Sequence, residues 1–249
     1  MDKSILRVMN DQNLRIGKAA RMIGVSIQTL RNWEKSGKLV SQRSPGGQRF
    51  YRLEDVKRFA VDLEKLSWSW AASAQPPEIP SEYYCERQDR FTSRLEKMAT
   101  VLVETQNVGV DIASLLTAVA GEIGDNSFMH NVGNWPDVPG IFFSYDVNKR
   151  VIVLADRGQG ITKTLLRVRP AITTDVEALQ IAFTEIVSAR QPEKRGNGLK
   201  VVRHIVESNP IGLLFRSGLA MAENLKSASS LRIKSAPDNI RGAYVVITF

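Results

Sequence analysis

Two short amphipathic helices separated by a glycine occupy residues 14–40, and this pattern limits the fold more than any other feature of the sequence. The apolar residues of the first helix recur at helical spacing. Gly24 then permits a tight turn, because a positive φ costs glycine little. Ser26 is placed to cap the second helix, which we expect at Ile27–Lys35 with its apolar side chains inward and its polar side chains outward.

A helix, a glycine turn and a second helix form the arrangement that places the second helix in the major groove of DNA. Arg31 can pair with phosphate or guanine there, and an amide side chain can read adenine. The outward polar residues are Gln28, Thr29, Arg31 and Asn32. The charge distribution supports a DNA-facing module, since residues 1–66 hold 14 of the 34 Lys and Arg but only 7 of the 26 Asp and Glu.

The next stretch, SQRSPGGQRF, has a Pro-Gly-Gly turn between two arginines. Two short strands around such a turn make a wing, which can place arginines on the DNA backbone. Over residues 14–60 the chain resembles the MerR family of winged helix-turn-helix proteins. The matching segments are Ile16-Gly17-x-x-Ala20, Gly24-Val25-Ser26, Thr29-Leu30-Arg31, Trp33-Glu34-x-x-Gly37-x-Leu39 and Arg49-x-Tyr51. The resemblance implies that double-stranded DNA is contacted by Arg31, Arg43, Arg49 and Tyr51.

The proline-rich segment at 67–82 lacks helical periodicity and predicts a semi-rigid linker. It separates a DNA-binding domain at 1–66 from a larger domain at 83–249. The larger domain begins with a helix at 83–108 that carries one apolar stripe. This helix either pairs two copies into a homodimer or packs on its own domain. The stripe consists of Phe91, Leu95, Met98, Leu102 and Thr105.

Beyond residue 111 the sequence alternates between helical and strand-like segments. We expect helices at 111–131, 175–189 and 199–208, the second capped by Thr174 or Asp175. The expected strands are 141–146, 151–156, IGLLFRS, SLRIKSA and AYVVITF. Helices mixed with a largely antiparallel sheet predict an α+β domain.

The first of three motifs in this domain is a polar stripe on the helix at 111–131. Glu122, Asn126 and His130 lie four residues apart and share one helical face. A carboxylate can activate a water molecule, and an amide oxygen one turn away can ligate Mg²⁺. For His130, a structural role on the helix is an equally good interpretation.

The second motif, DRGQGI, follows a strand, and the third, KRGNGL, opens a helix. Asp156 can accept a hydrogen bond from an adenine amino group, and Gly158 and Gly160 let the backbone approach the base. Glycines at the start of a helix expose backbone N–H groups to phosphate. Each of these two motifs alone is also compatible with an ordinary glycine turn.

In this order, the three motifs resemble those of the gyrase, chaperone, histidine-kinase and mismatch-repair (GHKL) superfamily, and its anti-sigma-factor serine kinase branch most closely. The resemblance implies a two-layer α/β sandwich of the Bergerat type, with a mixed, largely antiparallel sheet, that binds ATP and Mg²⁺. It implies adenine at Asp156, an ATP lid at 161–195 and catalysis by Glu122. The nucleotide and metal residues that it implies are Asn126 (also the metal ligand), Asp156, Gly158, Gly160, Lys194, Gly196 and Gly198.

Several function classes are disfavoured by residues that the sequence lacks. His130 and His204 are the only histidines, so no phosphoacceptor histidine precedes the ATP motifs, as a sensor histidine kinase requires. The single cysteine, Cys85, excludes an internal disulfide framework. No apolar run is long enough to span a bilayer and no signal-peptide block is present, which predicts a cytoplasmic protein without a membrane partner.

These observations lead to one hypothesis and two alternatives. The hypothesis is a DNA-binding regulator of transcription whose larger domain binds ATP and Mg²⁺ to modulate DNA or partner binding. The first alternative is a protein serine kinase or anti-sigma-like switch that acts on a partner protein. The second is a DNA-tethered ATPase of a mobile-element or phage-defence system.

Overall fold

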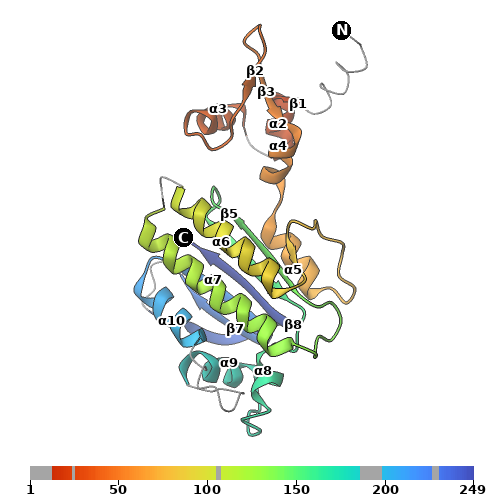
Figure 1. Cartoon of the computed structure of the whole chain (residues 1–249), viewed down its shortest axis with the longest axis vertical. Helices are drawn as coiled ribbons and strands as arrows, with labels where there is room; N and C mark the ends of the chain where they lie inside the picture. Colours follow the sequence, from red (N-terminus) through yellow and green to blue (C-terminus); the bar gives the residue numbers. More distant parts are fainter. Residues whose placement is uncertain (1–12, 24–25, 105–107, 186–197, 226–229) are drawn as a thin grey trace. The chain divides into compact units, whose positions relative to one another are not determined.

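The computed structural model of the chain describes residues 13–23, 26–104, 108–185, 198–225 and 230–249. It divides into two compact units, Met1–Asp62 and Leu63–Phe249, which are described separately below. Figure 1 shows the elements of each unit.

The smaller unit combines short helices with a three-stranded antiparallel sheet of order β1-β3-β2. Its elements are β1 (Asn13–Arg15), α2 (Ile16–Ile23), α3 (Ile27–Lys35), β2 (Gln42–Arg43), β3 (Arg49–Arg52) and α4 (Leu53–Ala60). α3 has the predicted bounds, and its first turn is capped because the Ser26 hydroxyl accepts a hydrogen bond from the Thr29 N–H at 3.0 Å. The ring of Trp33 packs against Phe59 of α4 with centroids 4.8 Å apart. The turn expected at Gly24 lies outside the described residues.

The larger unit is built on a five-stranded sheet of order β4-β5-β6-β8-β7, in which every described pairing is antiparallel. Its helices are α5 (Leu63–Ala72), α6 (Gln88–Glu104), α7 (Val110–Asn131), α8 (Gly160–Leu165), α9 (Asp175–Thr184) and α10 (Gly198–Ser208). Its strands are β4 (Tyr84–Cys85), β5 (Ile141–Asp146), β6 (Val151–Asp156), β7 (Gly212–Asn224) and β8 (Arg232–Thr248).

Helices cover both faces of this sheet, as two neighbouring residues of β5 show. Phe143 packs against Phe91 of α6, in the core that α6, α7, α9 and α10 share with the sheet. Phe142 packs instead against Trp70 of α5, with ring centroids 6.4 Å apart. Because successive residues of a strand point to opposite faces, α5 lies on the face opposite α6 and α7. Figure 1 shows α6 and α7 crossing one face of the sheet.

Several elements differ from the sequence-based expectations. Residues 67–72, expected to begin a linker, belong to α5, whose apolar side packs on the sheet and adds a third layer to the expected two. SLRIKSA and AYVVITF, expected as two strands, are parts of the single strand β8. The helix expected at 83–108 begins only at Gln88, because Tyr84 and Cys85 form β4, which pairs with β5. Its apolar stripe packs on its own domain, since Phe91, Met98 and Leu102 are fully buried. Thr105 lies outside the described residues, as does the expected continuation of α9 beyond residue 185.

Among the described residues, no helix is both long enough and apolar enough to cross a membrane.

The contact between α6 and α7 depends on a glycine. A Cβ atom placed on Gly124 of α7 would lie 2.2 Å from the Cζ atom of Phe91, whose side chain is fully buried. Gly124 therefore lets the two helices approach closely, although glycine in a helix interior is less favourable than alanine by about 1 kcal/mol.

We predict that Gly124→Ala lowers the free energy of unfolding of the larger unit by about 1–2 kcal/mol, because overpacking outweighs the gain in helix propensity. Chemical denaturation of the full chain measures this change. In a Phe91→Leu background the same substitution should cost less, because the ring that it meets is gone. Equal costs in both backgrounds would show that the Phe91 ring does not limit this position.

Candidate functional site

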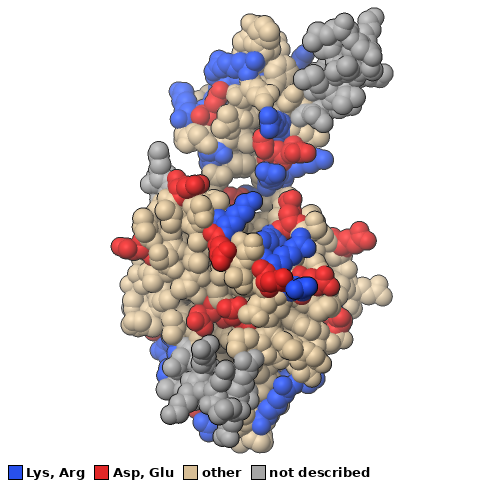
Figure 2. Space-filling view, viewed as in Figure 1, with Lys and Arg blue, Asp and Glu red and all other residues tan. Residues whose placement is uncertain are grey.

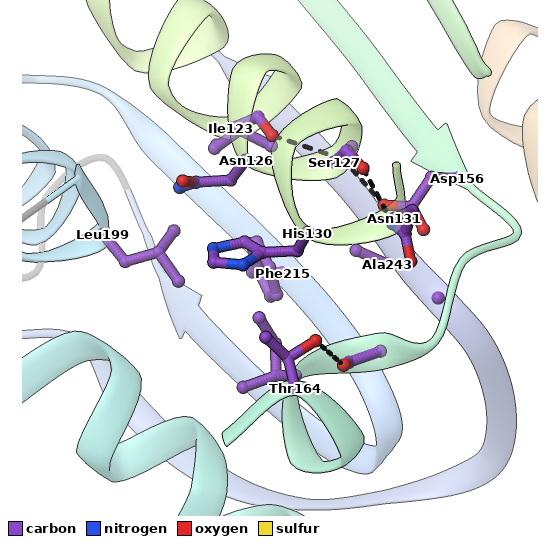
Figure 3. Close-up of a pocket in the computed structure, with 13 residues that line it drawn as sticks. Ile123, Asn126, Ser127, His130, Asn131, Asp156, Thr164, Leu199, Phe215 and Ala243 are labelled. Atoms are coloured by element: carbon purple, nitrogen blue, oxygen red, sulfur yellow. Dashed lines mark hydrogen bonds between the residues drawn. The ribbon is translucent and has the colours of Figure 1, made fainter. Parts of the chain in front are cut away.

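A cleft of about 470 Å³, its open mouth included, lies in the larger unit beside α7 (Figure 3). α7, α8, α10 and the strands β6, β7 and β8 all contribute to it. Its walls are Ile123, Asn126, Ser127, His130, Asn131, Asp156, Gly160, Ile161, Thr164, Leu199, Phe215, Gly242 and Ala243. The cleft thus brings together residues from all three sequence motifs, which are more than 70 positions apart from first to last. Glu122, Gly158 and Gly198, also expected at the site, do not line the cleft.

Asp156, at the end of β6, is the buried carboxylate of the cleft and is only 3 % exposed. Its Oδ2 atom accepts a hydrogen bond from the Ser127 hydroxyl at 2.7 Å, and its Oδ1 atom accepts one from the Gly158 N–H at 2.8 Å. Burial raises the pKa of Asp156, while the donors at Ser127, Gly158 and Ala243 oppose that shift without cancelling it. A carboxylate has further lone pairs, so Asp156 can still accept a bond from a ligand.

Two of the expected glycines sit where a side chain would collide with the motifs. A Cβ atom on Gly198, the first residue of α10, would lie 2.5 Å from Oε2 of Glu122 and 3.1 Å from Nδ2 of Asn126. A Cβ atom on Gly158 would lie 2.1 Å from Nδ2 of Asn131. The start of α10 therefore lies directly against Glu122 and Asn126. The expected site residues Lys194 and Gly196 lie outside the described residues.

Asn131 also lines the cleft, although it belongs to none of the three sequence motifs. It ends α7 and is 4 % exposed. Its amide donates to the Ser127 carbonyl at 2.7 Å, and its Oδ1 accepts the Gln159 N–H at 2.8 Å, which fixes the glycine turn after Asp156 against the helix. Ser127 and Asn131 form a second pair four residues apart, beside Asn126 and His130, and this second polar stripe is the signal that could have found Asn131.

α8, where the expected ATP lid begins, is tied to β7 and β8. The Ile161 N–H donates to the Ser217 hydroxyl at 3.0 Å, and that hydroxyl donates to the Gly242 carbonyl at 2.8 Å. Asp175 accepts hydrogen bonds from the Thr162 hydroxyl and, at 2.7 Å, from the Leu219 N–H. The first residues of the segment expected to form the lid are therefore held in place by β7, in which the sequence showed no motif.

The chemistry of the cleft suits a flat aromatic ring that carries an amino group. Apolar side chains of Ile123, Ile161, Leu199 and Phe215 form part of its walls, and Asp156 adds a buried carboxylate. Figure 3 shows the His130 ring between Leu199 and Thr164. Among the described residues, no group of three or more His, Cys, Asp and Glu side chains is arranged to hold a metal ion.

In the smaller unit, the polar residues of α3 lie where the sequence predicts. Gln28, Arg31 and Asn32 are exposed and Thr29 is half-buried, and the Gln28 amide donates to Asn32 Oδ1 at 3.2 Å. The Thr29 hydroxyl is 2.8 Å from that of Ser26, so Thr29 is part of the helix cap. Figure 2 shows lysine and arginine side chains gathered on this unit, with acidic side chains among them.

The wing residues differ more from the expectation. Arg49 is hydrogen-bonded to Glu34 of α3, and the Ser41 hydroxyl donates to Glu34 at 2.6 Å, so Arg49 holds the wing to the helix. Hydrogen bonds from Ser41 and Arg49 lower the pKa of Glu34. Arg43 is more than half exposed and its Nη2 atom is 3.6 Å from Glu34. Tyr51, expected to face DNA, is fully buried in the core of the unit, because its strand position points inward.

We predict that Ser127→Ala raises the pKa of Asp156 further, because it removes the side-chain donor that stabilises the carboxylate. NMR titration of the ¹³C-labelled aspartate carboxyl groups measures this pKa directly. An acid whose pKa is raised by folding destabilises the fold as pH rises through that pKa, so the stability loss of the variant should be larger at neutral than at acid pH. An unchanged pKa would show that the Ser127 bond is not made in solution.

Comparison with known proteins bears on the smaller unit. Residues 15–51 match the MerR family regulatory protein family. The Type II methyltransferase M.Eco47II of Escherichia coli is 41 % identical over 63 residues, which are 24 % of this chain and 15 % of the methyltransferase. The chain thus spans about 15 % of the length of that relative. Residues 15–51 contain α2, α3, β2 and most of β3, so the chain carries a MerR-family helix-turn-helix domain that binds DNA at these residues.

Proposed function

We propose that this chain is a regulator that binds double-stranded DNA through α3 and the wing, and binds ATP with Mg²⁺ in the cleft of the larger unit. The observation that supports the second part is that Asn126, Asp156 and the start of α10 surround one cleft. We assign the metal, the base and the phosphates of the nucleotide to three different motifs. These motifs are far apart in sequence, and their residues lie close together in space. The Bergerat-type fold is likewise part of this proposal, supported by α6, α7, α9 and α10 on one face of an antiparallel sheet.

Asp156 supports adenine as the base. The adenine amino group would donate to the carboxylate while the purine ring lies between the apolar walls. Guanine carries a carbonyl oxygen at the same ring position, which would face Asp156 without a hydrogen between them. An unsatisfied buried acceptor costs about 1–3 kcal/mol, so the cleft should prefer ATP over GTP by about tenfold or more.

The start of α10 supports the position of the phosphates. α10 has 11 residues, so the N–H groups of its first turn have no partner within the helix and its N-terminus carries a partial positive charge. The end of a helix with these properties can bind a phosphate. Asn126 would supply an amide oxygen to Mg²⁺, which prefers oxygen ligands and commonly bridges protein and phosphate oxygens.

Glu122 is the residue on which the two enzymatic alternatives depend. Its carboxylate lies against Gly198 at the start of α10, where we expect the terminal phosphate, although Glu122 does not line the cleft itself. A general base at this place would activate either water, as in an ATPase, or a serine of a partner protein, as in a kinase. Incubation with γ-labelled ATP separates these outcomes, because the label appears as free phosphate, on a protein, or stays on bound nucleotide.

We predict that Asp156→Ala lowers ATP affinity by at least about tenfold, because the base loses its acceptor. Isothermal titration calorimetry of the full chain with ATP and Mg²⁺ measures this, with GTP as a second ligand. As a matched control, Asp238→Ala removes an exposed carboxylate of the same unit that does not line the cleft. Equal ATP affinity of Asp156→Ala and wild type would place the nucleotide elsewhere.

For the DNA-binding part, we predict that Arg31→Ala weakens binding and reduces the slope of log affinity against log salt by about 1, as expected when one phosphate contact is lost. Fluorescence anisotropy with a labelled mixed-sequence duplex at several salt concentrations measures both. Arg87→Ala, which removes an exposed arginine of the larger unit, should change neither value. If both variants behave alike, Arg31 does not contact DNA.

A further inference from the structure

We propose that helix α5 is the output of the nucleotide cleft, so that occupancy of the cleft is transmitted through the sheet to the segment of chain that joins the DNA-binding unit. This inference rests on the proposed function and names the structural route by which ATP would change DNA binding. Leu63, the first residue of α5, directly follows Asp62, the last residue of the smaller unit.

Three strands each place one side chain in the cleft and the next side chain on α5 or the segment that follows it. Successive residues of a strand point to opposite faces, so the same stretch of backbone forms the cleft on one side and the seat of α5 on the other. In each pair the first residue lines the cleft and the second contacts α5 or the segment after it. The pairs are Asp156, the last residue of β6, with Arg157 directly after it, Phe215 with Arg216 in β7, and Ala243 with Tyr244 in β8. Arg216 and Tyr244 are directly paired across β7 and β8.

Arg157 makes the most extensive of these connections. It is 1 % exposed, and its Nη1 atom donates to the carbonyls of Trp70, Ala71 and Ser73 at 2.7, 3.0 and 2.8 Å. These carbonyls belong to the C-terminal end of α5 and the residues after it, where a helix has unpaired acceptors and favours a cation. Asp137 accepts hydrogen bonds from the Nε and Nη2 atoms of Arg157, which balances the buried charge.

Trp68 carries the connections from the other two strands. Its ring meets the Tyr244 ring edge to face at 5.1 Å, and the Arg216 guanidinium lies 4.6 Å from its centroid. The Tyr244 hydroxyl also donates to the Glu64 carbonyl, in the first turn of α5, at 3.4 Å. α5 is therefore contacted at both ends and in the middle by Arg157, Arg216 and Tyr244, each of which directly follows a cleft residue in the sequence.

A ligand shifts a conformational equilibrium only by its difference in affinity for the two states. An adenine amino group bound to Asp156 would hold the end of β6 in the position from which Arg157 reaches α5. Nucleotide would therefore bind more tightly when α5 is docked than when it is loosened. Because coupling between two binding sites is reciprocal, bound DNA must change ATP affinity by the same factor that ATP changes DNA affinity.

Hydrogen exchange of the wild-type full chain tests the first step without any substitution. We expect saturating ATP and Mg²⁺ to slow amide exchange in peptides that cover residues 63–74, on the face opposite the cleft, as well as in peptides of the cleft itself. GTP at the same concentration should have little effect. Protection of the cleft peptides by ATP with no change in residues 63–74 would overturn the inference and leave ATP binding intact.

The second step is tested by measuring ATP affinity of the full chain with and without a saturating mixed-sequence DNA duplex at low salt. We expect DNA to change the ATP affinity of the wild type by about fivefold or more, since fivefold is the lower end of typical allosteric coupling. Trp68→Ala and Arg157→Lys should bring this factor close to 1 while each still binds ATP. Trp135→Ala is the matched control, because its ring packs on Phe128 of α7 instead of on α5.

The outcomes separate the inference from the function on which it rests. A wild-type chain that binds no ATP overturns both. If the wild type binds both ATP and DNA but its coupling factor is 1, the inference alone is overturned. Wild-type coupling in both Trp68→Ala and Arg157→Lys would also overturn it. If Trp68→Ala does not fold, Trp68→Phe keeps a ring at this position, and the exchange experiment on the wild type still decides the first step.

Discussion

The burial of one antiparallel sheet on both of its faces is the constraint on which the larger unit depends. The sheet supplies apolar side chains to α6, α7, α9 and α10 on one face, and strands β5, β6 and β8 pack against α5 on the other. Because the side-chain period of a strand is two, a register shift of one residue would exchange these two sets. Phe142 and Phe143, neighbours that pack against different helices, show how closely the register is specified.

Within this apolar framework two neighbouring buried charges, Asp156 and Arg157, both have hydrogen-bond partners. Asp156 and Arg157 are adjacent, yet Asp156 accepts hydrogen bonds on the face of α7 while Arg157 donates on the face of α5. A buried charge without such partners would cost several kcal/mol, so both side chains depend on contacts that the whole unit has to assemble. The cleft and the surface on which α5 packs are thus opposite faces of the same sheet. This is the physical basis for expecting ligand binding in the cleft to affect α5.

In the smaller unit, some elements depend on residues close in sequence and others on contacts between distant residues. Its helix α3 and the Ser26 cap follow from residues that are close in sequence, and its wing turns at the predicted Pro-Gly-Gly segment. Glu34, however, joins the wing to α3 through Ser41 and Arg49, so an arginine that sequence reasoning assigned to DNA also holds the domain together. An exposed Arg31 and a half-buried Arg49 are therefore not equivalent in their roles.

Local chemistry was enough to predict α3, α7, β5 and β6 to within a residue, because caps, turn residues and helical spacing act over a few positions. That Asn126, Asp156 and Gly198 belong to one nucleotide site was implied by the resemblance of three ordered motifs to a known superfamily, and it stays a prediction. The residues at 67–72 looked like a linker because nothing nearby marks their helix, which is stabilised by the sheet. Arg157 reaches carbonyls up to 87 positions earlier in the chain, and Tyr51 is buried by its strand position. Contacts of this kind depend on how distant segments pack, and only the tertiary structure could reveal them.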